Sequence, residues 1–145
     1  MSFELDTEGI QCLILSAREA AASAYCPYSE YPVGAALLGA DGETYIGCNV
    51  ENSSYGLSIC AERVALFNAV SNGCRKFVAL ALVGGGRLDA ATPCGACRQV
   101  LSEFCTAEMP IFYAALKGSD VARTTIGDLL PLAFKFNDKK ETGRS

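Results

Sequence analysis

Residues 77–104 read FVALALVGGGRLDAATPCGACRQVLSEF, and this stretch decides the class of fold. The apolar run Phe77–Val83 predicts a buried strand, which is typical of the centre of a sheet that is covered on both faces. The glycines at 84–86 predict a loop, and Gly95–Phe104 predicts a helix. Because Pro110–Leu116 predicts a further strand, the stretch forms a strand–helix–strand unit of an α/β protein.

The sequence on either side of this unit supplies the remaining elements. Asp41-Gly42 between two short apolar segments is a strong signal for a hairpin turn. Asp6 is a suitable N-cap for a first helix, and Gly73 suits the end of a second. The other predicted strands are Val33–Leu38, Thr44–Val50 and Val121–Thr125, and the other predicted helices cover 6–23, 60–72 and 126–130.

From the order of these elements we expect an α/β protein with three layers, in which helices cover both faces of a mixed five-stranded sheet. The chain has 145 residues, half of them hydrophobic, which is enough for one domain with a sizeable core. We expect this catalytic domain to span residues 1–136. The polar segment 137–145 is predicted to be a mobile tail.

Acidic residues outnumber basic ones by 16 to 12, and the formal net charge is −4. Such a surface does not attract nucleic acid backbones, so we expect no nucleic acid partner and favour a small neutral substrate. No apolar run reaches the roughly 18 residues that span a membrane, so we expect no membrane partner. The acidic first residues do not resemble a secretory signal, which predicts a cytoplasmic protein. The high hydrophobic content indicates an oligomer.

The chain contains no histidine. This excludes Ser-His-Asp and Cys-His catalysis and every metal site with a histidine ligand. A transition metal must therefore be bound by cysteine or carboxylate, and Asp, Glu, Lys, Tyr or Cys must carry any proton. Because disulfides are rare in the cytosol, we expect the 8 cysteines to be metal ligands, reactive thiols or core residues.

Two short motifs carry the candidate chemistry. Cys60-Ala61-Glu62 and Pro93-Cys94-Gly95-Ala96-Cys97 each stand at the predicted start of a helix. The positive end of a helix stabilises thiolates and lowers the pKa values of the thiols. We therefore predict one Zn²⁺ per chain, held by Cys60, Cys94 and Cys97.

Three protein ligands leave the fourth tetrahedral position to water, which is typical of a catalytic zinc site. Glu62 is close enough to Cys60 in sequence for its carboxylate to lie over that water, accept a proton and return it. Glu62 is therefore the predicted catalytic residue. Arg63 and Arg98 are predicted to offset the negative charge that three thiolates place around one Zn²⁺.

Plainer interpretations remain for each of these residues. Cys94 and Cys97 also fit a redox pair, or a structural zinc site that is closed by Cys48 or Cys105. Glu62 also fits a solvated acid at a helix start, and both arginines also fit surface charges. The cysteines outside the two motifs are predicted to be small buried residues: Cys12, Cys26, Cys48, Cys74 and Cys105.

The motifs match a signature of zinc-dependent deaminases, and the chain resembles the small homotetrameric cytidine deaminases from about Ala17 to Phe134. The resemblance implies a cytidine deaminase-like fold and a hydrolase of pyrimidine salvage. Such an enzyme converts cytidine and 2'-deoxycytidine into uridine and 2'-deoxyuridine with a zinc-activated hydroxide, while Glu62 protonates N3 and then the leaving amine. The matching stretches are Tyr28-Ser29, Val33–Leu37, Gly47–Asn52, Cys60–Arg63, Pro93–Val100 and Leu129–Pro131.

The resemblance also implies how the nucleoside is bound. Asn49 and Glu51 match residues that hold the ribose hydroxyls, which suits an amide and a carboxylate. Backbone groups beside Ala61 and Cys94 would bind the pyrimidine edge. Tyr31 stands where the family usually has a phenylalanine near the base. Ordinary polarity at the end of a hairpin remains the alternative for the first two residues, and core packing remains the alternative for Tyr31.

Phe134 matches a C-terminal aromatic residue that reaches the active site of a neighbouring subunit, so the resemblance implies a homotetramer with shared sites. Core packing is the alternative for this residue too. Two other functions stay open: a deaminase that acts on polynucleotides or blasticidin, and a non-catalytic module with a closed zinc site. The acidic balance disfavours polynucleotides, and a catalytic role for Glu62 disfavours the module.

Overall fold

The apolar run at the centre of the sequence forms strand β3 (Phe77–Gly84), and a mixed sheet is built around it. The structure is a computed structural model that describes residues 5–85 and 90–136. Gly86 of the predicted glycine loop and the predicted tail at 137–145 lie outside these residues. The other strands are β1 (Val33–Gly39), β2 (Thr44–Cys48), β4 (Pro110–Ala114) and β5 (Ala122–Thr125).

The sheet has five strands in the order β2-β1-β3-β4-β5. β3 and β4 are parallel, whereas the other three neighbouring pairs are antiparallel. A parallel pair needs a crossover connection, and a helix in the segment between β3 and β4 supplies it. The predicted mixed five-stranded sheet is therefore confirmed.

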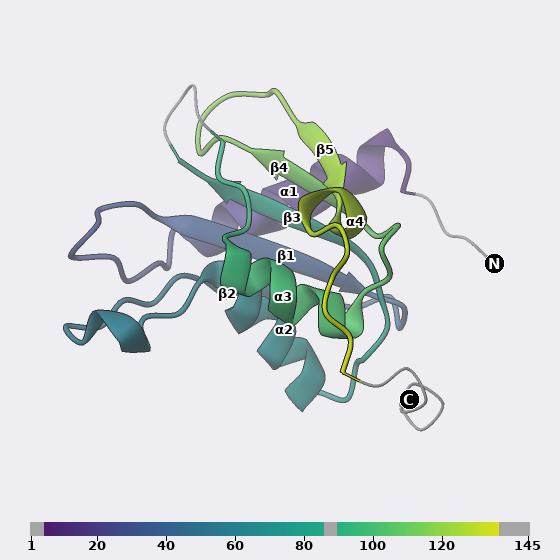
Figure 1. Ribbon diagram of the computed structural model, residues 1–145. Coiled ribbons are helices and arrows are strands. Elements are labelled where there is room, and N and C mark those ends of the chain that lie inside the picture. Colours follow the sequence, from purple (N-terminus) through teal and green to yellow (C-terminus); the bar gives the residue numbers. More distant parts are fainter. Residues whose placement is uncertain (1–4, 86–89, 137–145) are drawn as a thin grey trace.

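Helices lie on both faces of this sheet (Figure 1). α1 packs on one face, mainly against β1 and β3, while α2 and α3 lie next to each other on the opposite face. The predicted three layers are confirmed. Among the described residues, no helix has the length and apolar character to cross a membrane. The helices are α1 (Thr7–Ala21), α2 (Ala61–Ser71), α3 (Gly95–Phe104) and α4 (Ile126–Leu129), with a 3-10 turn η1 (Tyr55–Leu57).

The alternation of side chains along the strands divides the core into two parts. In β1, Leu37 faces the layer of α2 and α3, whereas Ala36 faces α1. In β3, Leu80 and Leu82 face α2 and α3, whereas Ala81 faces α1. The small residues on the α1 side of the sheet let that helix lie close to it. The larger residues on the other side fill the space under α2 and α3, the two helices that carry the cysteine motifs.

Strand β2 ends earlier than its predicted range, Thr44–Val50. Its last residue is Cys48, and Val50 instead forms isolated bridges with Tyr25 and Ile59. The chain therefore turns away from the sheet at the end of the hairpin, where it leads toward the start of α2. These pairings connect segments far apart in sequence, so the local pattern of residues does not reveal them.

Strand β4 also ends before the predicted Leu116, and a side chain on α1 binds the carbonyl groups that follow its last residue. Arg18 donates from Nε to the Leu116 oxygen at 3.1 Å and from Nη2 to the Ala115 oxygen at 3.3 Å. The same Nη2 lies 3.3 Å from the Gly118 oxygen. The pairing of β4 with β3 reaches Ala114, and Arg18 ties the segment beyond it to α1.

Gly47 in β2 allows α2 to lie directly on the sheet. A Cβ atom at this position would overlap the backbone nitrogen of Ala65 and lie 2.6 Å from the carbonyl oxygen of Ala61. Both atoms belong to the first turns of α2, the helix that follows Cys60. The absence of a side chain at Gly47 therefore sets the distance between the sheet and one half of the cysteine cluster.

We predict that Gly47→Ala lowers the melting temperature by about 5 °C, because an added methyl group that meets backbone costs about 2 kcal/mol. It also shifts Cys60 away from the other motif and weakens metal binding. Gly56→Ala is the matched control, since nothing lies within 4 Å of its added Cβ. Thermal unfolding of both variants checks this, and equal melting temperatures would contradict the close packing.

Candidate metal centre and substrate cleft

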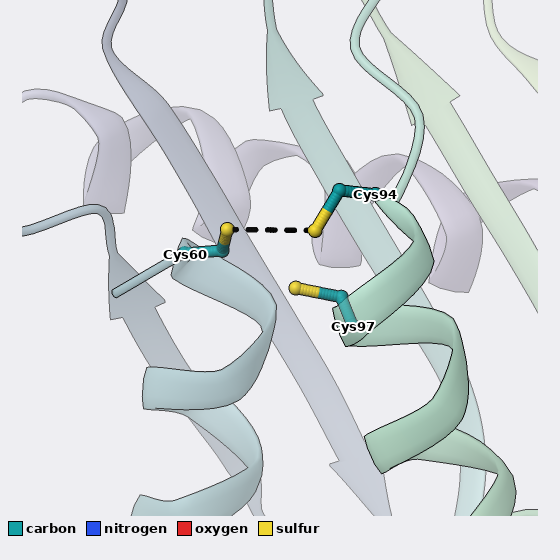
Figure 2. Close-up of side chains that lie close together, drawn as sticks. All are labelled: Cys60, Cys94 and Cys97. Carbon is teal, nitrogen blue, oxygen red and sulfur yellow. Dashed lines mark hydrogen bonds between the residues drawn. The ribbon is translucent and has the colours of Figure 1, made fainter. Parts of the chain in front are cut away.

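Three cysteine thiols meet where α2 and α3 begin. Cys60 is the N-cap of α2, Cys94 is the N-cap of α3, and Cys97 lies in the first turn of α3. Their sulfur atoms all lie within 4.8 Å of one another, and those of Cys60 and Cys94 are 3.8 Å apart. Figure 2 shows the three thiols pointing toward a common centre. The predicted cluster is therefore present.

The thiols at the two helix starts are not used in capping hydrogen bonds, which leaves them available to bind an ion. Neither N-cap side chain makes the hydrogen bond to its own helix that a serine or aspartate would make there. The thiol of Cys97 and the guanidinium of Arg63 lower the pKa of Cys60 to about 5. Proximity to Cys60 raises the pKa of Cys97. One ionised thiol therefore opposes the ionisation of its neighbour. A divalent cation removes this repulsion, because it stabilises all three thiolates together.

Arg63 lies beside the cluster, as the sequence predicts. Its Nη2 donates to the Cys60 sulfur at 3.6 Å. Arg98 does not share this arrangement, because its side chain binds the carbonyl oxygens of Pro93 and Leu129. The contact with Leu129 spans 31 residues, so sequence spacing gave no signal for it. Both arginines have specific partners, and the surface-charge alternative is wrong for them.

The donor set fits a zinc ion with one open position. Within the described residues, the group that can hold a metal contains Cys60, Cys94 and Cys97 and no fourth ligand. Cys48 and Cys105 are outside it, and burial raises the pKa of Cys105 to about 12. The alternative of a closed structural site is not supported, since such sites have four protein ligands.

Glu62 lies in the first turn of α2 and is only 4% exposed. The alternative of a solvated acid at a helix start is therefore wrong. Burial raises the pKa of Glu62 to about 7. Glu62 and the thiols of Cys60 and Cys94 line one cleft of about 680 Å³. A buried carboxyl group thus stands at the wall of the space that a ligand of the metal would occupy.

Asn49 and Ala61 line the same cleft. The side chain of Asn49 accepts a hydrogen bond from the Val33 nitrogen at 2.9 Å and donates one to the Tyr31 oxygen at 2.9 Å. One hydrogen of its amide nitrogen remains available to a ligand. The side chain of Ala61 is a methyl group, so only its backbone could form a hydrogen bond with a ligand.

Glu51 is held in the cleft by the turn before β1. Its Oε1 accepts from the backbone nitrogens of Tyr28 at 3.0 Å and Ser29 at 3.1 Å, and its Oε2 accepts from the Ser29 hydroxyl. The Ser29 hydroxyl holds the pKa of Glu51 below its usual value. Sequence reasoning gave Ser29 no role, because it lies 22 residues from its partner. Glu51 therefore has defined partners in this turn, an arrangement that agrees both with a ligand-binding role and with ordinary polarity at a hairpin end.

The two aromatic residues of the predicted site are both exposed, so core packing is wrong for each. Tyr31 is 43% exposed and lines the cleft. Phe134 is 67% exposed and is not among the residues that line the cleft. Within one chain, the structure therefore brings Tyr31 to the site and leaves Phe134 outside it.

The other cysteines correct one expectation. Cys74 and Cys105 are buried as predicted, whereas Cys26 and Cys48 are half-buried and Cys12 is exposed. Cys12 lies on α1, whose buried positions are Leu13, Ile14, Ala17, Ala20 and Ala21. Its place on the helix turns it to solvent, because the helical period sets which side chains face the sheet.

We predict that the purified chain holds about one zinc ion and that Cys97→Ser loses most of it, since a neutral hydroxyl is a poor substitute for a thiolate ligand. Cys12→Ser is the matched control, because this thiol is exposed and outside the cluster. Zinc per chain, measured by elemental analysis after dialysis, checks this. Equal zinc content in both variants would show that the metal is held elsewhere.

Comparison with known proteins agrees with this geometry. The cytidine deaminase of Sporosarcina psychrophila is 51% identical over 129 residues, which cover 89% of this chain and 93% of that protein. The cytidine deaminase of Halalkalibacterium halodurans is 47% identical over 131 residues, which cover 90% and 98% of the two chains. The crystal structure of cytidine deaminase from Burkholderia pseudomallei has a TM-score of 0.81 and 48% identity, covering 86% of this chain and 98% of that one.

The family that is described as the cytidine and deoxycytidylate deaminase zinc-binding region matches residues 8–113. The matched region begins in α1 and ends in β4, so it includes both cysteine motifs, Glu62 and the hairpin end with Asn49 and Glu51. The sequence, the fold and the cysteine cluster thus lead to one conclusion: the chain belongs to the cytidine and deoxycytidylate deaminase family.

Proposed function

We propose that this chain removes the amino group of cytidine and 2'-deoxycytidine by hydrolysis of the C4–N bond. The products are uridine or 2'-deoxyuridine and ammonia, and the enzyme serves pyrimidine salvage. The observation that carries the proposal is the buried carboxyl group of Glu62 in the cleft that Cys60 and Cys94 also line. This cleft combines a metal position that water can reach with a carboxyl group beside it that can accept and return a proton. Relatives that share about half of its residues are cytidine deaminases.

The residues divide the chemistry between them. Cys60, Cys94 and Cys97 would hold the zinc ion, which would supply a water molecule that is acidic near neutral pH. Glu62 accepts a proton from the water that adds to C4 of the cytosine ring and delivers this proton to N3. It then carries the second proton of that water to the amino nitrogen, so that the C4–N bond breaks and ammonia leaves. Arg63 offsets part of the negative charge of the thiolates through its contact with Cys60.

Recognition of the nucleoside uses the rest of the cleft. Backbone groups beside Ala61 and Cys94 bind the edge of the pyrimidine, and the ring of Tyr31 packs near the base. Asn49 and Glu51 bind the ribose hydroxyls with the groups that their own hydrogen bonds leave free. A neutral nucleoside suits a chain with a net charge of −4 better than a polynucleotide does.

We also propose that the enzyme is a cytoplasmic homotetramer, formed by the domain at residues 1–136, and that residues 137–145 are a tail. Three large apolar side chains on the C-terminal segment, residues 129–136, support this assembly: Leu132 is 103% exposed, Phe134 67% and Phe136 76%. Side chains of this kind are usually covered in an assembly. Phe134 then completes the cleft of a neighbouring subunit.

The reaction is tested first by the fall in ultraviolet absorbance when cytidine becomes uridine. Cytidine, 2'-deoxycytidine, a cytosine-containing oligonucleotide and blasticidin are assayed side by side on protein of known zinc content. Turnover of the two nucleosides supports the proposal. Turnover confined to the oligonucleotide or to blasticidin would overturn the substrate, and zinc without turnover of any of them would favour a structural module.

We predict that Glu62→Gln lowers kcat on cytidine by at least about 10²-fold, because an amide cannot accept and return a proton. Zinc content and melting temperature stay near those of the unsubstituted chain, since the side chain keeps its shape. Glu43→Gln is the matched control, as this residue is exposed in the β1–β2 turn. Near-normal kcat in Glu62→Gln would disprove the proton-transfer role.

Shared active sites are tested by mixing two variants, one without turnover and one with weakened substrate binding. Phe134→Ala alone is expected to raise KM about tenfold, since it removes an aromatic contact worth about 1.5 kcal/mol. Tetramers assembled from Glu62→Gln and Phe134→Ala subunits then contain some sites with both native residues. We expect activity per Phe134→Ala subunit to rise on mixing. No rise, or an active monomer in sedimentation, would contradict shared sites.

A further inference from the structure

Arg98 connects two segments that are distant in the sequence. Its Nε donates to the carbonyl oxygen of Pro93 at 2.7 Å, directly before Cys94. Its Nη1 donates to the carbonyl oxygen of Leu129 at 3.0 Å, at the end of α4. Both hydrogen bonds are partly buried. One guanidinium group therefore fixes the loop that carries a metal-binding thiol to the C-terminal part of the chain.

The start of α3 needs such support because its N-cap is a cysteine. A serine or aspartate N-cap holds the first turn with its side chain, but Cys94 makes no such bond and points its thiol toward Cys60. The first backbone contact of the helix runs from the Arg98 nitrogen to the Cys94 oxygen at 2.9 Å. The Arg98 side chain adds the contact on the other side of Cys94, to the Pro93 oxygen.

The C-terminal segment is bound to α3 a second time, one turn further along. Lys135 donates from Nζ to the carbonyl oxygen of Ser102 at 2.8 Å. Arg98 and Ser102 are four residues apart, so they lie on one side of α3. Arg98 contacts the metal loop and the C-terminal segment together, whereas Lys135, on that segment, contacts α3 alone.

We infer that Arg98 is a positioning residue: it holds Cys94 in place by bonding the Pro93 and Leu129 carbonyls at once, and this contact determines how firmly the metal is retained. The inference rests on the metal centre of the proposed function. The rigid plane of a guanidinium presents Nε and Nη1 in different directions. A lysine offers its donors at a single nitrogen, so it cannot serve both carbonyls in this geometry.

The experiment measures the rate at which the zinc-loaded protein releases zinc to an excess of a chromogenic chelator. The variants are Arg98→Met, Arg98→Lys and Lys135→Met, and a cobalt-substituted sample of each gives the thiolate-to-cobalt absorption band. We expect both Arg98 variants to release zinc about tenfold faster, as is typical when a partner of a metal ligand is lost. Their cobalt bands also change, while Lys135→Met behaves like the unsubstituted chain.

Each other result overturns the inference. Normal zinc release in Arg98→Met would show that the contact is only structural. Normal zinc release in Arg98→Lys would show that a positive charge is sufficient and that the separate Nε and Nη1 donors of the guanidinium are not needed. Release from Lys135→Met as fast as from Arg98→Met would assign the effect to the C-terminal segment as a whole. If Arg98→Met does not fold, as thermal unfolding shows, Arg98→Lys decides.

The same samples separate this inference from the proposed function. Zinc-loaded protein that turns over no cytidine would overturn the proposed function, and the Arg98 role would still be decided by zinc release. An active enzyme whose Arg98 variants keep zinc normally and show unchanged cobalt bands would overturn the Arg98 role alone.

Discussion

Two helices that are separated in the sequence must begin at one point in space for a single ion to be bound by Cys60, Cys94 and Cys97. Most of the fold serves this requirement. The larger side chains of β1 and β3 support α2 and α3 on one face, and Gly47 sets the distance between α2 and the sheet. The two positive helix ends meet around sulfur, which stabilises negative charge where the chain has no histidine to bind a metal in neutral form.

The same convergence places Glu62 correctly. Because it lies in the first turn of α2, directly after the N-cap cysteine, its position relative to the ion is fixed by one turn of helix and needs no flexible loop. In the proposed mechanism, burial of its carboxyl group keeps bulk water from competing for the proton that it would move. The placement of α2 therefore affects both the metal site and the proposed proton transfer.

Much of this arrangement could be predicted from the sequence, because the deciding signals are local. An apolar run gave β3, a turn signal gave the β1–β2 hairpin, and cysteines at two predicted helix starts gave the cluster. The errors concern contacts between distant segments. The sequence could not show that Arg18 binds the carbonyls after β4 or that Arg98 binds Leu129, since each contact depends on the completed fold.

Solvent-facing positions were the other source of error. Cys12 is exposed although its residue type favours burial, because its place in the helical period decides which way it faces. Tyr31 and Phe134 are also exposed, which excludes the alternative of core packing. Large aromatic side chains usually leave water in a folded chain, and the proposed function assigns these two exposed surfaces to a ligand and to another subunit.

The hydrogen bonds of Asn49 and Glu51 have a consequence for the thermodynamics of binding. Both side chains are already held by the chain's own backbone, and Glu51 also by the Ser29 hydroxyl. Immobilising a free polar side chain on binding costs about 0.5–1.5 kcal/mol in lost rotamer entropy. Here that ordering takes place during folding, so under the proposed function more of the enthalpy of the sugar contacts would be retained as affinity.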